Sequence, residues 1–344
     1  AIGAITTGLI LVVAVITRFT QGAWMVVVAI PVIVVLFSGV KRHYDGVARG
    51  LERGVVRFGD IGQNHVVLVV TGFHAATAEA LGYIRSLRPV SLESLYVGGG
   101  PTEEAQASWQ DLARDGLPLV VPGPGDPVDA VIHHVRAIPR DPGDFVTVVI
   151  PEHFHKRSLL SALTMPVTFR LKVRLLREPQ VVITDVPVLE EAGRPKGVDA
   201  RPLIPERIEA IVFVTMPHDA AVRALNYAVS LNAHHTRAVF LATDPEEAPE
   251  VLRRWGELGV EIPLEVVDAP FRDLGPPLLE EVRRVTADPG TVAAVVIPEF
   301  LVTRWWHRLL HNNRALFIKR QLLFEPRVIL SSVPYLLGRT DGSR

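Results

Sequence analysis

The chain has 344 residues, of which 48% are hydrophobic and 21% charged, and its formal net charge is −1. It contains no cysteine, which excludes a disulfide framework, a thiolate nucleophile and a cysteine zinc site. The apolar content can fill complete cores, which excludes a disordered tail, and the near-zero charge argues against a nucleic-acid-binding protein.

Two apolar runs open the chain, Ala1–Thr17 and Phe19–Val40, and Arg18 between them is the only charged residue of this region. A bilayer core requires about 20 apolar residues in a helix. We therefore expect an α-helical transmembrane hairpin over residues 1–40, with its first helix truncated at Ala1. The alternatives are a signal peptide, which would need a basic start and a single apolar run, and a buried soluble hairpin.

Basic residues follow the second apolar run, beginning with Lys41, Arg42 and Arg49. Positive flanks stay on the cytoplasmic side of a membrane. This pattern predicts a basic juxtamembrane linker over residues 41–64 and a cytoplasmic location for everything from about residue 41 onward.

The rest of the chain repeats itself at an offset of 144 to 147 residues. The matching segments are His65–Thr71 with Glu209–Thr215, Val148–Phe154 with Val295–Leu301, and Leu175–Leu189 with Leu322–Leu336. We therefore predict a duplicated domain: repeat 1 over residues 65–189, a linker over 190–207, repeat 2 over 208–337, and a frayed tail over 338–344.

Each repeat alternates short Val/Ile runs with segments of helical spacing, which predicts an α/β fold with two tandem doubly wound parallel-sheet repeats. In repeat 1 the expected strands are Val66–Val70, Leu92–Val97, Leu117–Val121, Phe145–Ile150 and Val181–Thr184, and the expected helices include Ala75–Leu87, Thr102–Arg114 and Asp126–Ile138. In repeat 2 the same order predicts strands at 209–215, 236–242, 262–267, 291–297 and 327–331, with helices at 219–231, 245–258, 271–286 and 303–323.

Ligands of open α/β sheets bind at the carboxyl ends of the strands. The candidate nucleotide-binding residues follow from this rule, and they are Thr71, Gly72, His74, Gly98, Gly99, Thr215 and His218. The alternatives are a flexible turn for the glycines and helix capping for the Thr and His residues. Repeat 2 has Ala242-Thr243-Asp244 in place of the glycines, so a glycine-dependent site would belong to repeat 1 only.

The last helical region of each repeat is basic, which is compatible with lipid headgroups or an anionic ligand. The residues that represent this surface are Arg157, Lys172, Arg304 and Lys319. The alternative is a solvated charged face. We also expect Glu152 and Glu299, which follow a strand in each repeat, to pair with Arg157 and Arg304 or to cap a helix.

No catalytic arrangement is apparent in the sequence, and we do not expect an enzyme. There is no P-loop, G-x-S-x-G or G-x-G-x-x-G motif after a strand. His307 and His311 have the spacing of a two-histidine metal site but no third ligand, so neither a metal nor a permanent cofactor is expected.

Three segments carry a resemblance to a known family: RFTQGAW (Arg18–Trp24), KRHYDGVARGL (Lys41–Leu51) and the region Arg304–Leu337. They resemble the C-terminal part of permeases of the amino acid–polyamine–organocation superfamily, most of all the KimA-type potassium importers. The resemblance implies proton-coupled symport by membrane helices upstream of this chain. It also implies a tandem universal-stress-protein-like tail that is often dimeric and regulated by cyclic di-AMP.

The first hypothesis is thus the membrane stub and cytosolic regulatory domain of a secondary transporter for potassium or another cation, with cyclic di-AMP or an adenine nucleotide as regulatory ligand. The expected partners are membrane lipid, the upstream transmembrane domain and a second copy of the chain, with no nucleic acid. The alternatives are an amino acid permease whose tail is a ligand-free assembly module, and a membrane-anchored nucleotide-binding enzyme.

Overall fold

The structure is a computed structural model that divides into two compact units, Ala1–Arg53 and Gly54–Arg344. It describes residues 2–19, 24–25, 28–35, 37–39, 41, 56–114, 116–154, 166–189, 205–270, 273–301 and 313–336. The first unit contains helix α1 (Ile2–Thr17) and further helical residues within 24–41. Among the described residues, no helix combines the length and the apolar character needed to cross a bilayer, so the expected transmembrane hairpin is not confirmed. Residues 20–23, 26–27, 36 and 40 of its second run lie outside the described part.

The second unit alternates strands and helices in the predicted order. Its repeat 1 contains β1 (Asn64–Val70), α3 (Ala75–Leu87), β2 (Ser91–Tyr96), α4 (Thr102–Ala113), β3 (Leu119–Val120), α5 (Pro127–Ala137), β4 (Phe145–Phe154), α7 (Pro166–Leu175) and β5 (Val181–Leu189). Its repeat 2 contains β6 (Arg207–Val214), α8 (Asp219–Ser230), β7 (His235–Ala242), α9 (Glu247–Glu257), β8 (Leu264–Asp268), α10 (Gly275–Thr286), β9 (Thr291–Leu301), α12 (Asn313–Leu322) and β10 (Val328–Leu336).

Local sequence explains how these elements begin. Helix α5 starts as predicted, because the Asp126 carboxylate accepts a hydrogen bond from the Val128 N–H at 2.8 Å and Pro127 stands in the first turn. Strand β1 is rich in Val because helices cover both faces of the sheet, and only His65 of its seven residues is not fully buried.

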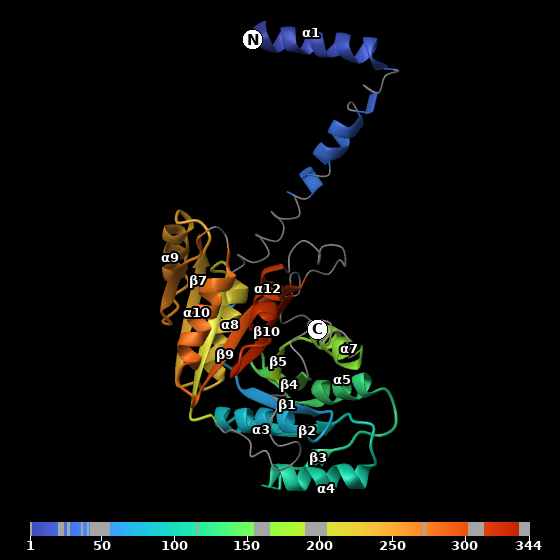
Figure 1. The fold of residues 1–344 in the computed structure, drawn as a ribbon, viewed down its shortest axis with the longest axis vertical. Helices are drawn as coiled ribbons and strands as arrows, with labels where there is room; N and C mark the ends of the chain where they lie inside the picture. The colour runs from blue at the N-terminus through green and yellow to red at the C-terminus, as the bar shows by residue number, and fades with distance from the viewer. Residues whose placement is uncertain are drawn as a thin grey trace. The chain divides into compact units, whose positions relative to one another are not determined.

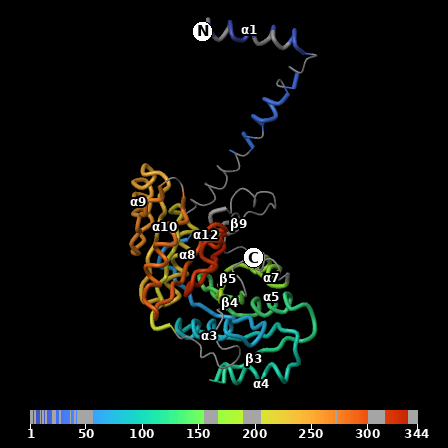
Figure 2. Tube along the Cα trace, in the orientation of Figure 1, coloured from blue at the N-terminus to red at the C-terminus, as the bar shows by residue number. Residues whose placement is uncertain are grey.

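The described strands form one ten-stranded sheet, in the order β3-β2-β1-β4-β5-β10-β9-β6-β7-β8 (Figure 1). Every described pair is parallel except β5 with β10, which is antiparallel and joins the two repeats. Thr184 of β5 lies opposite its repeat-2 equivalent, Ser331 of β10, and their hydroxyl oxygens are 2.8 Å apart. The repeats are therefore two halves of one sheet related by a pseudo-twofold axis at this pair, and they occupy separate halves of the unit (Figure 2).

Four strands near the middle of the sheet extend further than the sequence predicted. The prediction ended the fourth strand of repeat 1 at Ile150, before a proline, but β4 continues to Phe154. Pro151 pairs with Val186, and the same pattern recurs at Pro298 in β9. Glu152 and Glu299 thus lie within strands, which corrects the expectation that they follow a strand and the alternative that they cap a helix, whereas their expected partners Arg157 and Arg304 lie outside the described residues.

The two faces of the sheet are packed differently at the junction of the repeats. On one face, a single apolar core includes residues of α3, α4, α8 and α9 and runs across both repeats. On the other face, α5 and α7 pack on one core and α10 and α12 on a separate one. Polar side chains are buried in the strands on either side of this junction, among them Glu152, Asp185, Glu299 and Ser332. The second face therefore has a charged seam where the first face has a continuous apolar core.

Candidate functional site

The candidate residues of repeat 1 lie at the carboxyl ends of two neighbouring strands. Strands β1 and β2 pair in parallel, with Val70 beside Tyr96. Thr71, Gly72 and His74 follow β1, and Gly98 and Gly99 follow β2. The sheet therefore brings the candidate residues of repeat 1 to one edge. The strand ends named from the sequence are therefore neighbours in the sheet, and binding of a ligand there stays a prediction.

His74 lies close to a second imidazole that the candidate set did not include. The ring centroids of His74 and His153 of β4 are 5.3 Å apart. Burial lowers the pKa of His74, and the neighbouring His153 lowers it further. His74 stands at the start of α3 but makes no side-chain capping bond, while Thr77 Oγ1 donates to the Gly72 carbonyl at 2.7 Å. The lowered pKa favours the neutral form of His74, whose Nδ1 lies 3.5 Å from Thr77 Oγ1 in the first turn of α3.

The glycine run packs against an aromatic pair. Tyr96 stacks on Phe73 with ring centroids 5.7 Å apart and an interplanar angle of 14°. A Cβ on Gly98 would lie 2.5 Å from the Tyr96 ring, so a larger residue there would force the ring to move, and the Gly100 N–H donates to the Tyr96 hydroxyl at 3.1 Å. Gly99, in contrast, is exposed and has no neighbouring atom within 4 Å of a Cβ position. Gly98 has a structural role, and Gly99 leaves the backbone open to a ligand beside two aromatic rings.

The repeat-2 candidates lie at the end of β6, in the other half of the sheet. His218 is buried, and its Nδ1 accepts a hydrogen bond from the Ala221 N–H at 3.3 Å, which caps α8. Burial lowers the pKa of His218 to about 4. Thr215 directly follows the strand and is half-buried. Because β4, β5, β10 and β9 lie between β1 and β6, the candidate residues of the two repeats form two separate groups.

The two described lysines of the basic surface belong to the charged seam. Lys172 Nζ lies 2.6 Å from Glu152 Oε1 and 2.9 Å from Asp185 Oδ1, and Lys319 pairs with Glu299. Burial alone would lower the pKa of Lys172, but the charges of Asp185 and Glu152 outweigh burial and raise it. The charge of each lysine is thus compensated within the chain.

Other charges of this surface are compensated as well. Arg170 pairs with Asp126 at 2.6 Å, and Arg174 pairs with Asp129. Arg157 and Arg304 lie outside the described residues, as do His307 and His311. The described part of α7 therefore offers little uncompensated positive charge to lipid.

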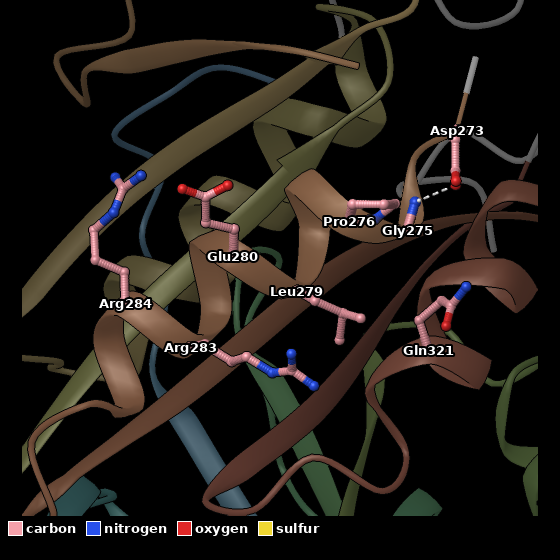
Figure 3. A pocket seen from close by; sticks show the side chains of 8 residues that line it. All are labelled: Asp273, Gly275, Pro276, Leu279, Glu280, Arg283, Arg284 and Gln321. Carbon is pink, nitrogen blue, oxygen red and sulfur yellow. Dashed lines mark hydrogen bonds between the residues drawn. The ribbon is translucent and has the colours of Figure 1, made fainter. Parts of the chain in front are cut away.

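Two cavities among the described residues lie elsewhere on the surface of the unit. One, of about 760 Å³, is an open depression over α10 and α12, in which the Gly275 N–H donates to Asp273 Oδ1 at 3.0 Å (Figure 3). Another, of about 590 Å³, lies between the end of β3 and the start of α5. None of the candidate nucleotide-binding residues lines either cavity. Among the described residues, no group of three His, Asp or Glu side chains could hold a metal ion.

Fold and site together define a class of protein: a pseudosymmetric pair of parallel α/β repeats that has, among the described residues, a polar and aromatic strand-end cluster in repeat 1. The family model described as "KimA potassium transporter C-terminal domain" matches residues 63–188 and 206–335, which include nearly all of both repeats. The chain belongs to this family.

Individual proteins are similar to the chain over parts of their length. The potassium transporter KimA of Bacillus subtilis (strain 168) is 27% identical over 137 residues, which is 38% of this chain and 22% of that protein. The chain thus matches about a fifth of the length of this curated relative. A universal stress protein from Archaeoglobus fulgidus DSM 4304 superposes with a TM-score of 0.45 at 12% identity, over 79% of this chain and 96% of the other.

Proposed function

We propose that this chain is the C-terminal part of a potassium transporter and that its unit Gly54–Arg344 is a cytosolic regulatory domain. The observation that carries the proposal is the family match. It includes both repeats, and the family is described as the C-terminal domain of a potassium transporter. The basic flank after Val40 supports a cytosolic tail attached to a membrane protein. Potassium uptake, coupled to protons as the permease resemblance implies, is assigned to helices upstream.

The proposal includes a regulatory nucleotide, such as cyclic di-AMP, at the strand-end cluster of repeat 1. A purine base can stack on the Phe73–Tyr96 pair, and the open backbone at Gly99 allows a phosphate or ribose to approach. The neutral ring of His74 can donate to or accept from the base. His218 is already engaged in capping, which supports repeat 1 rather than repeat 2 as the site.

Calorimetric titration of the full chain in detergent with cyclic di-AMP, ATP and AMP tests this part of the proposal. We expect saturable binding of one of them, at one site per chain. His74→Ala should weaken that binding about tenfold or more, since loss of a hydrogen bond and of ring contact costs about 1.4 kcal/mol or more. The matched variant His218→Asn should bind as the wild type does. Absence of binding for all three nucleotides would remove the nucleotide from the proposal.

The assembly-module alternative is also supported by a specific observation, because Lys172 and Lys319 are neutralised within the chain rather than held open for an anion. Within the described sheet, β5 and β10 are already paired, so a homodimer formed by sheet edges would have to use β3 or β8. Light scattering with and without nucleotide separates the two functions. A dimer whose mass does not change with any nucleotide favours the assembly module. Nucleotide hydrolysis by the chain would instead favour the membrane-anchored enzyme.

A further inference from the structure

The segment that leads into β1 is bound to both repeats. Residues 57–63 precede the first strand, and they are among the first described residues after the N-terminal unit. The Asn226 side chain of α8 in repeat 2 holds the beginning of this segment. Its Nδ2 donates to the Arg57 carbonyl at 2.8 Å, and its Oδ1 accepts from the Gly59 N–H at 3.2 Å.

The end of the same segment is bound to repeat 1. Asp144 Oδ1 accepts a hydrogen bond from the Gln63 N–H at 2.7 Å, and the Phe145 N–H donates to the Gln63 carbonyl at 2.8 Å. The backbone of Gly62 lies so close to that of Gly143 that a Cβ at residue 62 would be 2.3 Å from it. Residues 57–63 therefore form a strap with one anchor on each repeat.

Without the strap, Asn226 would destabilise α8 at its position. It is 3% exposed and lies in the interior of α8, where asparagine is a poor helix former and an unpaired buried amide is unfavourable. Both polar atoms of its amide are satisfied by the strap. Its equivalent in repeat 1, 144 residues earlier, is Gly82, which has no such side chain. The repeats differ at this position because the chain enters the unit only once, and the entering segment contacts α8 of repeat 2.

A turn lies between the two anchors of the strap. Gly59 has a φ of +97°, a conformation that other residues rarely adopt, and the Ile61 N–H donates to its carbonyl at 2.8 Å. Phe58 packs against the core shared by both repeats. A shift of one repeat relative to the other would change the distance between Asn226 and Asp144 and so act on the strap.

We propose that Asn226 is a latch that fixes the entering chain to repeat 2, so that the strap over residues 57–63 transmits changes in the arrangement of the repeats to the segment upstream. The latch stands on the geometry alone. The transmission of a ligand signal rests on the regulatory function proposed above, because a ligand shifts an equilibrium only if it prefers one arrangement.

Hydrogen–deuterium exchange on the full chain in detergent tests the latch. Asn226→Leu keeps the size and favours the helix but removes both hydrogen bonds, and exchange in peptides spanning residues 57–63 should become about tenfold faster, equivalent to about 1.4 kcal/mol. Ser230→Ala is the matched control, because its hydroxyl bonds only to the Tyr227 carbonyl of the same helix in the described contacts. Unchanged exchange of the strap in Asn226→Leu would overturn the latch. An equal increase across α8 and β6 would also overturn it, since Asn226 would then merely stabilise repeat 2.

A second arm adds cyclic di-AMP to the wild type and to Asn226→Leu. The proposal predicts that the nucleotide changes exchange of the strap in the wild type, and that the change is lost in the variant although calorimetry still detects binding. Binding without any change at residues 57–63 would overturn the transmission. If cyclic di-AMP does not bind at all, the regulatory function fails while the first arm still decides the latch.

Discussion

Replacement of Lys172 tests the account of the charged seam most severely. Lys172 neutralises two buried carboxylates, those of Glu152 and Asp185, and its own side chain is 23% exposed. Removal of one partner from a buried ion pair costs about 3–5 kcal/mol, and water at the partly exposed lysine reduces this figure. We therefore expect Lys172→Met to lower the free energy of unfolding by about 2–4 kcal/mol at pH 7.5.

The loss should depend on pH in a defined direction. Burial raises the pKa of Glu152, and Lys172 opposes that rise. Without the lysine, the pKa of Glu152 rises further. At pH values above the ordinary pKa of a carboxyl group, the folded variant therefore binds more protons than the unfolded chain. Stability then falls as pH increases, and the deficit of Lys172→Met should be smaller at pH 5 than at pH 7.5. Asp185→Asn in the same chain should restore part of the loss.

Equilibrium urea unfolding, followed by tryptophan fluorescence at both pH values, measures these differences. Arg253→Met is the matched control, since Arg253 also pairs with two carboxylates but is 54% exposed. Exposed pairs contribute about 1 kcal/mol or less. A deficit for Lys172→Met no larger than that of the control, or one that is equal at pH 5 and pH 7.5, would refute the buried-network account.

Two further variants test local geometry. Gly98→Ala should cost about 1–3 kcal/mol in a urea titration, because its Cβ would collide with the Tyr96 ring, whereas Gly99→Ala should be nearly neutral; equal effects would contradict the packing described. His218→Ala should lose about 1 kcal/mol through loss of the α8 cap, and His218→Asn should retain the cap. Because the pKa of folded His218 is lowered to about 4 from 6.5, the wild type should lose stability as pH falls through that interval. His218→Asn should lose less over the same interval, and an unchanged pH dependence would show that His218 is not the group responsible.

The elements of each repeat could be predicted because their apolar patterns are strong. Helix Ala75–Leu87 was predicted with the bounds that the structure shows, and Asp126 and Pro127 marked the start of α5. The ends of β4 and β9 were missed because a proline reads as the end of a strand. The prolines are accommodated near the sheet centre, so Glu152 and Glu299, which were expected beyond their strands, lie within them.

The union of the repeats into one sheet was not apparent from the sequence, since a periodic pattern does not say which strands are neighbours. One signal was present: Thr184 and Ser331 are hydroxyl residues at equivalent places in mostly apolar strands, and they meet at the pseudo-twofold axis. The lysine pairs and the strap depend on contacts between distant segments, such as Asn226 with Arg57, which no local motif announces.

The most direct test of the central claim is uptake by the transporter to which we propose that this chain belongs, purified and reconstituted in liposomes. Influx of potassium, or of rubidium as its tracer, is measured with and without cyclic di-AMP on the side of the tail. The account predicts potassium uptake that the nucleotide changes in the wild type and no longer changes in His74→Ala. Uptake of an amino acid instead of potassium, or potassium uptake that no nucleotide affects, would contradict it.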